Sequence, residues 1–397
     1  MVFKIFNNSF LLIDILKLIL ASLVVRCKKK EENAIWLISE KIDEARDNGF
    51  TFFNYLLENK NNINAYYVIS RKSMDEEKIY DKSKIVYDKS WKHFRLYIKS
   101  SALISSQLLP FPTKRKICNI FKFLCLNNPK RVWLQHGVVK DLVPHKSMDY
   151  DKMEYDLMTC STTRECEFIK KEYGYPENVA QVIGLCRYDT LVDCSEDSNR
   201  ILIMPTWRKW LGGKKVQEFK KSNFYINYIN LLQNKVFNDL LQKSNMKVYF
   251  YLHYGFQSYS ELFENELSNN SNIIICKADS YDVQMLLRES KLLITDYSSI
   301  FWDFAFMRKP TIYFQFDKAD YDTGHYPPAY FNYTDDAFGK VTYKINELNY
   351  EFSNLLNEKL KIDPVYLNRT NNAFYFRDNK NCDRTFEKIK SLFYESE

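Results

Sequence analysis

The stretch KLLITDYSSIFWDFAFMRKPTIYFQF, residues 291–316, shows most directly how this chain folds. Its run 291–298 is typical of a buried strand, 300–308 has the pattern of a helix, and 311–316 is a second apolar run. Apolar strands that alternate with helices predict a parallel sheet covered on both faces.

The same alternation extends from this stretch in two series. Strand-like runs of the first series lie at 33–39, 65–70, 84–88, 102–107, 131–137, 155–161 and 181–184, with a helix at 44–59. The second series adds strand-like runs at 200–207, 247–253 and 272–277, with helical patterns at 222–243 and 282–290. We therefore expect an α/β protein of GT-B-like type, in which two Rossmann-like domains have parallel sheets facing across a cleft, plus an N-terminal apolar helix.

The polar stretch 193–199 is the expected linker between the two domains. We expect an apolar and basic N-terminal segment at 1–30, a first domain at 31–194 and a second at 195–397. The C-terminal region 345–397 has helical patterns, and we expect it to pack back across the domains.

The composition is that of a globular protein. Of the 397 residues, 46% are hydrophobic and 27% charged, and the net charge of +7 suits anionic partners such as nucleotides or lipid head groups. No recognition motif for nucleic acid accompanies this charge, so we expect no nucleic acid partner. The nine cysteines form no CxxC pair, which indicates a reduced, cytoplasmic protein. Neither a P-loop nor a G-x-G-x-x-G motif occurs, and we expect no cofactor and no metal.

The apolar run 9–25 is followed by the basic residues Arg26 and 28–30. A signal peptide has its positive charges before the apolar run, so this is not a secretion signal. Three arrangements fit: an anchor in the membrane interface, a packed N-terminal helix, or a single span with the charges inside. Because basic clusters bind anionic leaflets, we expect a peripheral protein at the cytoplasmic face of the cell membrane.

Histidines stand at the ends of two predicted strands, where open α/β sheets bind ligands. His136 lies in the sequence QHG at 135–137, and His253 ends the run 247–253. A histidine at such an end can be a general base near neutral pH, whereas the structural alternative is a core histidine bonded to a carbonyl. His253 can donate to a phosphate oxygen or protonate a leaving group.

Polar residues also stand at the end of the strand-like run 200–207. Arg208 has a planar guanidinium that suits phosphate, and the hydroxyl of Thr206 can join it. A solvated surface arginine is the alternative.

Three further polar residues lie where the strand at 291–298 ends and the next helix begins. Asp296, Ser298 and Ser299 can cap that helix, bind a phosphate at its start, or do both. Asp303, on the helix itself, is either a solvated carboxylate or an acceptor for the hydroxyls of a ribose.

Together these motifs resemble the CDP-glycerol glycerophosphotransferase family of teichoic-acid and capsule synthesis. The similar stretches are QHG at 135–137, PTWR at 205–208, His253, TDYSSIFWDFAFMRKP at 295–310 and HYPPAYFNYTDDAFG at 325–339. The resemblance implies a GT-B fold with the acceptor in the first domain and a CDP-polyol donor in the second. It implies that His136 is the catalytic base and that the donor pyrophosphate is held by Arg208, His253, Ser298 and Ser299. We assign Thr206 to the same pyrophosphate site, and Asp296 and Asp303 to the nucleotide and its ribose.

We therefore expect an enzyme that transfers a polyol phosphate, glycerol phosphate first among the candidates, from a CDP-polyol to a hydroxyl of a lipid-linked or polymeric acceptor. His136 would take the proton of that hydroxyl, and CMP would leave in line. One alternative is a nucleotide-sugar-dependent glycosyltransferase of the same fold. The other is an inactive scaffold in a membrane-bound synthesis complex.

Overall fold

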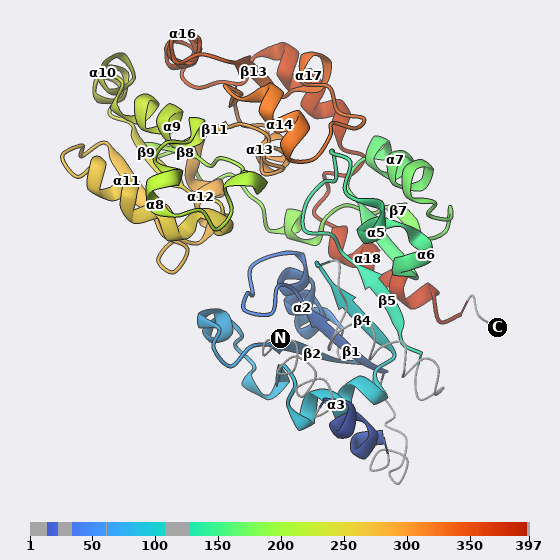
Figure 1. Cartoon of the computed structure of the whole chain (residues 1–397). Helices are drawn as coiled ribbons and strands as arrows, with labels where there is room; N and C mark the ends of the chain where they lie inside the picture. Colours follow the sequence, from blue (N-terminus) through green and yellow to red (C-terminus); the bar gives the residue numbers. More distant parts are fainter. Residues whose placement is uncertain (1–13, 23–33, 61, 108–127, 395–397) are drawn as a thin grey trace.

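Two parallel sheets, one after the other along the chain, form the framework of the protein (Figure 1). The computed structural model describes residues 14–22, 34–60, 62–107 and 128–394. Within these residues the first sheet has the strand order β3-β2-β1-β4-β5-β6-β7 and the second has β10-β9-β8-β11-β12-β13. In each sheet the order reverses beside the first strand of its series, which is where open α/β sheets bind ligands. The prediction of an α/β fold with two parallel sheets is confirmed.

The first sheet is built from short, mostly buried strands. They are β1 (Ala34–Ser39), β2 (Ile63–Ile69), β3 (Ile85–Tyr87), β4 (Ala102–Ser105), β5 (Lys130–Trp133), β6 (Leu157–Cys160) and β7 (Ala180–Val182). The helices of this part are α2 (Asn48–Asn59), α3 (Trp91–Lys99), α5 (His145–Met148), α6 (Tyr150–Met153) and α7 (Thr163–Tyr173). Alternate residues of β1 fill two cores, because successive side chains of a strand point to opposite faces. Trp36 packs with α2, whereas Leu37 packs with α3.

The second sheet follows the same plan. Its strands are β8 (Arg200–Ile203), β9 (Lys247–Tyr251), β10 (Ile273–Cys276), β11 (Ser290–Thr295), β12 (Thr311–Phe314) and β13 (Gly339–Thr342). Its helices are α8 (Val216–Phe219), α9 (Asn223–Gln233), α10 (Lys235–Lys243), α11 (Ser260–Glu266), α12 (Val283–Glu289), α13 (Phe301–Phe306), α14 (Lys318–Gly324), α15 (Tyr333–Asp336), α16 (Ile345–Asn357) and α17 (Pro364–Ala373). Large apolar cores lie on both faces of this sheet.

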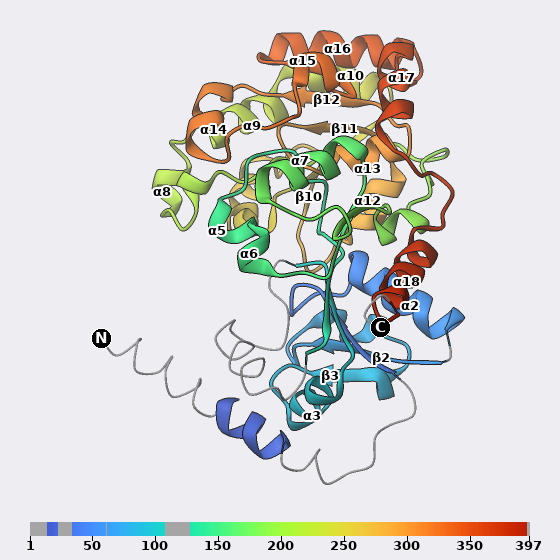
Figure 2. The ribbon, with the colours of Figure 1, turned by 90° about the vertical axis from the view of Figure 1, so that its right-hand side faces the viewer.

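The last helix, α18 (Asn381–Ser391), returns to the first sheet and lies beside α2 (Figure 2). Its Phe386 ring lies 5.7 Å from the ring of Trp36. The Asp189 carboxylate accepts hydrogen bonds from the backbone N–H groups of Asn381 and Cys382, at 2.8 and 2.7 Å, and so anchors the start of the helix. The C-terminal helices thus contact both sheets, while the boundaries predicted near residues 30 and 194 stay a prediction.

Two details differ from the sequence-based expectation. The helical stretch expected at 222–243 is two helices, α9 and α10, because the side chain of Asn234 caps α10 by accepting the Phe237 N–H at 3.1 Å. The short strand β13 follows β12 at the sheet edge and was not predicted, since four residues carry little periodicity.

A short helix over residues 14–22 packs against the first sheet. Leu18 and Ala21 are buried beside α3, whereas Leu16 and Leu20 are more than half exposed. None of the helices in the described ranges is long and apolar enough to cross a membrane. The predicted N-terminal segment otherwise falls on residues 1–13 and 23–30, which lie outside the described residues.

Candidate active site

A cavity of about 580 Å³ lies between the carboxyl ends of the two sheets. The loops after β1, β2, β4 and β5 form one wall, and those after β8, β9, β10 and β11 form the other. Four of the residues predicted from the sequence line it: His136, His253, Ser299 and Asp303. The structure thus brings together groups that lie as far as 167 residues apart in the chain, as between His136 and Asp303.

His136 stands on a tight turn after β5. The preceding residue, Gln135, has a left-handed φ of 59° and is buried. Its side-chain Nε2 donates to the carbonyl of Thr159 at 2.6 Å, and its own carbonyl accepts from Asn48 at 2.8 Å. These bonds hold a backbone conformation that a non-glycine residue seldom adopts, which fixes the direction of the next side chain.

The Nδ1 atom of His136 lies 2.6 Å from Oδ2 of Asp47. The carboxylate of Asp47 attracts the protonated ring and raises the pKa of His136 above its usual 6.5. A carboxylate partner fixes the neutral ring with its proton on Nδ1, so the lone pair of Nε2 is free to accept a proton. The His136 side chain is 70% exposed, so Nε2 is open to a substrate.

Asp47 immediately precedes α2, in the loop after β1. Burial by itself favours its neutral form, but the positive charges of His136 and Arg187 outweigh that effect and lower the pKa of Asp47. Its other oxygen, Oδ1, accepts from Nη1 of Arg187 at 3.0 Å. The loop is held by the buried carboxylate of Glu40, which accepts the Asp47 N–H at 2.8 Å.

Arg187 connects this pair to the second domain. Its Nε and Nη2 donate to the two oxygens of Asp303 on α13, at 2.8 and 3.0 Å. Nη1 also donates to the carbonyl of His136 at 2.7 Å. The guanidinium is 6% exposed, and Asp303 is fully buried. The row His136, Asp47, Arg187 and Asp303 therefore crosses the cleft as one hydrogen-bonded unit.

His253, at the opposite wall, is held as a neutral donor. Its Nδ1 accepts the N–H of Gly255 at 3.1 Å, which leaves the proton on Nε2. Burial, followed by the charge of nearby His136, lowers the pKa of His253 to about 4. The ring stacks on Trp207, with centroids 6.0 Å apart. An N–H aimed from a rigid ring can bind an anionic oxygen.

Arg208 does not lie in the cavity with the two histidines. It is fully buried, and its guanidinium contacts Asp317 through Nε at 2.7 Å and Asp296 through Nη2 at 2.8 Å. Nη1 donates to the carbonyl of Thr206 at 2.6 Å. The rings of Tyr297 and others cover its faces. Arg208 is not among the residues that line the cavity, and this geometry gives it the role of tying strand ends of the second sheet together.

The remaining predicted residues surround that arginine or face the cleft. Asp296 is fully buried and accepts the N–H of Thr206 at 2.8 Å. Neither residue lines the cavity, and the same holds for half-buried Ser298. Ser299 does line it, and a Cβ added to Gly137 would lie 3.0 Å from Ser299 Oγ, so the two domains meet closely beside His136. These placements leave the assigned roles as predictions.

Sequence reasoning did not find Asp47 and Arg187. Asp47 falls within 44–59, which was expected to be helical, whereas α2 begins at Asn48 and leaves Asp47 in the loop after β1. Its usable signal was the acidic stretch that follows a strand, since His136 also ends a strand of that sheet. Arg187 lies in the 3₁₀ helix Cys186–Asp189, where no pattern marks it. Within the described ranges, no group of three or more His, Cys, Asp or Glu side chains is placed to hold a metal ion.

Two parallel α/β sheets with a histidine–carboxylate pair in the cleft between them define a two-domain enzyme of the GT-B-like class. The chain belongs to the CDP-glycerol:poly(glycerophosphate) glycerophosphotransferase family, whose sequence model matches residues 20–391.

Individual relatives agree with this family. The chain is 27% identical over 369 residues to the minor teichoic acid biosynthesis protein GgaB of Bacillus subtilis (strain 168), covering 90% of this chain and 40% of that protein. It is 22% identical to the teichoic acid poly(glycerol phosphate) polymerase of Staphylococcus epidermidis, covering 84% of this chain and 49% of that one. The chain thus spans less than half the length of these relatives.

Solved structures share the fold. One structure of the wall teichoic acid polymerase TagF superimposes with a TM-score of 0.71 at 19% identity, over 100% of this chain and 98% of that chain. The Staphylococcus aureus MnaA–UDP structure gives a TM-score of 0.59 at 14% identity, over 91% and 97% of the two chains.

Proposed function

We propose that this protein transfers a polyol phosphate, glycerol phosphate first among the candidates, from a CDP-polyol to an acceptor hydroxyl and releases CMP. Family membership supports the donor class. The observation that carries the proposal is the 2.6 Å contact of His136 with Asp47 on one side of the cleft, opposite the N–H donor of His253. The names of the relatives, a minor teichoic acid biosynthesis protein and a teichoic acid poly(glycerol phosphate) polymerase, support a product of teichoic-acid synthesis.

The mechanism follows from the two rings. Nε2 of His136 takes the proton of the acceptor hydroxyl, and the oxygen forms a bond to the phosphorus that bears the polyol. The bond from that phosphorus to the CMP oxygen breaks on the opposite side, so CMP leaves with the electron pair. Asp47 stabilises the imidazolium that forms. His136 then returns its proton to solvent.

His253 and Ser299 act on the donor. The Nε2–H of His253 and the Ser299 hydroxyl donate to oxygens of the diphosphate, where negative charge develops as CMP departs. A bound diphosphate would favour the charged ring and raise the pKa of His253 from its value of about 4. We propose that Arg208 contributes indirectly, by fixing the loops after β8 and β11.

The two domains divide the substrates between them. We propose that the first sheet, with His136 and Asp47, carries the acceptor, which is lipid-linked or polymeric. The second sheet, with His253, carries the CDP-polyol. This GT-B arrangement is supported by the position of the cavity, to which both sheets contribute strand ends.

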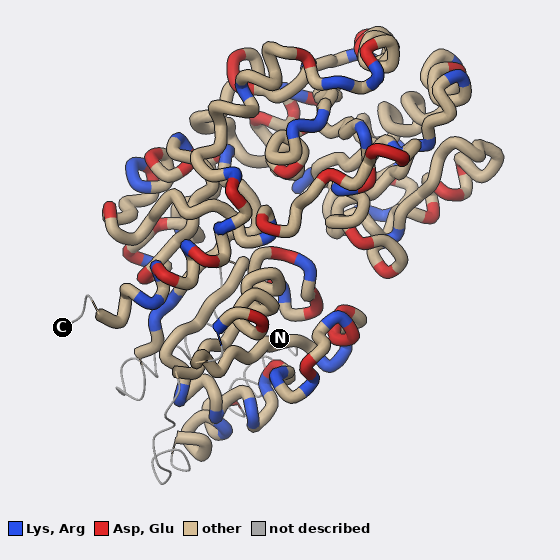
Figure 3. Tube along the Cα trace, turned by 180° about the vertical axis from the view of Figure 1, so that it is seen from behind, with Lys and Arg blue, Asp and Glu red and all other residues tan. Residues whose placement is uncertain are grey.

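We propose that the first domain lies on the cytoplasmic face of the membrane. The helix over 14–22 exposes Leu16, Ile19 and Leu20, and the neighbouring α3 exposes Trp91. Several Lys and Arg residues lie along the chain at this end of the molecule (Figure 3). They include Lys82, Lys84, Lys92, Arg95 and Lys99. Apolar side chains beside cations suit an anionic interface.

Vesicle co-sedimentation tests this surface. Leu16→Ser with Leu20→Ser should release the protein from phosphatidylglycerol vesicles, whereas Ile226→Ser, at an exposed apolar residue of α9, should not. Equal binding of all three proteins would contradict the proposal.

The transferase reaction is tested by its product. The protein should release CMP from CDP-glycerol or CDP-ribitol when a lipid-linked acceptor is present. Release of a nucleoside diphosphate from a nucleotide sugar would identify a glycosyltransferase instead. No turnover of either donor by folded protein with a competent acceptor would favour the scaffold.

A further inference from the structure

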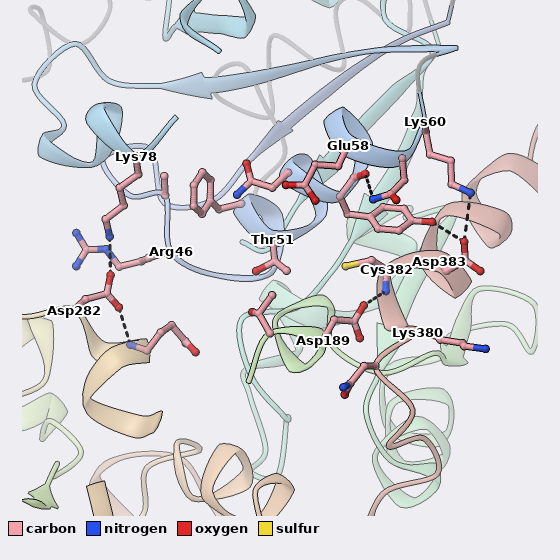
Figure 4. Close-up of a pocket in the computed structure, with 18 residues that line it drawn as sticks. Arg46, Thr51, Glu58, Lys60, Lys78, Asp189, Asp282, Lys380, Cys382 and Asp383 are labelled. Atoms are coloured by element: carbon pink, nitrogen blue, oxygen red, sulfur yellow. Dashed lines mark hydrogen bonds and ion pairs between the residues drawn. The ribbon is translucent and has the colours of Figure 1, made fainter. Parts of the chain in front are cut away.

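A second cavity, of about 830 Å³, adjoins the active-site cavity, and Figure 4 shows its lining. Helix α2 and the start of α18 form two of its walls, and the start of α12 in the second domain forms another. Its volume exceeds the 580 Å³ of the catalytic cavity, and no step of the proposed reaction uses it.

The second cavity adjoins the catalytic one. Arg46 and Gln284 line both cavities, and Arg46 directly precedes Asp47, the partner of His136. Nζ of Lys78, in the 3₁₀ helix Met74–Lys78, lies 2.7 Å from Asp282 across the domain boundary. Arg46 and Gln284 thus form a border that the two cavities share.

The lining of this cavity suits hydroxyl groups. Thr51, Asn54 and Glu58 form a polar stripe on α2, because residues three and four apart share a helix face. Among the described residues, the Asn54 amide has no hydrogen-bond partner and the Glu58 carboxylate has no ion-pair partner. The aromatic ring of Tyr55 also lines the cavity. An amide can donate to and accept from a polyol hydroxyl, whereas a carboxylate accepts from it.

The charged side chains that line this cavity include cations that can bind an anion. Protein donors already occupy the three aspartates of the cavity: Asp189 binds backbone N–H groups of α18, Asp282 binds Lys78, and Asp383 binds Lys60 at 3.3 Å. Lys380 has no ion pair within the described part of the chain. Nη1 of Arg46 likewise has no hydrogen bond there, since Asp75 binds Nε and Nη2. These two cations are available to phosphodiester oxygens.

We propose that the second cavity binds the units of the acceptor that precede the reacting hydroxyl, a chain of polyols joined by phosphodiesters. This inference rests on the proposed function, because it treats His136 as the site of the reacting hydroxyl. The cavity gives the enzyme a preference for acceptors that already carry several units.

The test compares short and long acceptors. Asn54→Ala with Glu58→Ala should raise the KM for a glycerol-phosphate oligomer of about six units, by about fivefold for each hydrogen bond lost. The KM for a one-unit acceptor, the KM for CDP-glycerol and kcat should stay unchanged. The matched control is Glu261→Ala with Asn265→Ala, an exposed pair at the same spacing on α11, which should behave as wild type. Lys380→Glu, on the opposite wall, gives a second variant should the first fail to fold.

Direct titration of donor-free protein with the same oligomers separates this inference from the proposed reaction. Wild type that binds the long oligomer more tightly than the double variant supports the cavity even if no CMP is released. Equal affinity, or equal KM changes for short and long acceptors, overturns it. Equally tight binding of a neutral maltooligosaccharide overturns the recognition of phosphodiesters.

Discussion

Replacing Asp47 by asparagine removes the negative charge beside His136 and leaves the shape of the side chain almost unchanged. In the transition state the ring becomes an imidazolium whose Nδ1–H donates to Asp47 at 2.6 Å. A hydrogen bond between charged groups contributes roughly 1.5–3 kcal/mol. Its loss should lower kcat for CMP release by about 10- to 150-fold.

The pH profile gives a second readout of the same change. His136 accepts a proton only when neutral, so the rate falls as the pH drops through its pKa. Because Asp47 raises this pKa above 6.5, Asp47→Asn should move the acidic limb of the profile to lower pH. The measurement is kcat/KM for CMP release across the range from acidic to neutral pH.

Asp303→Asn is the matched control. Each of the two variants removes one carboxylate that contacts Arg187, so both should lower the stability of the protein. Only Asp47→Asn removes the contact with His136, so only it should shift the acidic limb. A profile that does not move in Asp47→Asn, or that moves equally in Asp303→Asn, would refute the reasoning.

Three further predictions concern other parts of the molecule. His253→Ala should lower kcat for CMP release by about 10²-fold without changing the KM for the acceptor, because it removes a donor to the leaving diphosphate; an unchanged kcat in steady-state assays would contradict this. Arg208→Met should lower the free energy of unfolding in urea by roughly 3–5 kcal/mol, because Asp296 and Asp317 lose their buried partner; a decrease below about 1 kcal/mol would contradict this. Gly184→Ala should lower the Tm, since Gly184 has a φ of +92° and the new Cβ would lie 1.9 Å from Asn381 Oδ1. An unchanged Tm by circular dichroism would contradict this and would show that α18 can shift without loss of stability.

The strands could be predicted because burial on both faces leaves a clear apolar run. The run 291–298 covers all of β11 except its first residue, Ser290, and the run 311–316 contains β12. The end of a strand was also a good guide to His136 and His253, since parallel strands bring their carboxyl ends to one edge. Both histidines line the cleft.

The partners of these residues could not be predicted in the same way. Asp47 and His136 are 89 residues apart, and Arg187 reaches Asp303 across 116 residues, so only the folded chain shows their contacts. Arg208 illustrates the opposite case. An arginine after a strand has the pattern of a phosphate ligand, but the fold brings two carboxylates to it and buries all three groups.

The most direct test of the account is CMP release by wild type and His136→Ala, with CDP-glycerol and CDP-ribitol as donors and a lipid-linked acceptor. We predict release by wild type from one of the two donors, and its loss in a His136→Ala protein that keeps the thermal unfolding profile of wild type. Release that persists at the wild-type rate in the variant would contradict the role of His136 as the base.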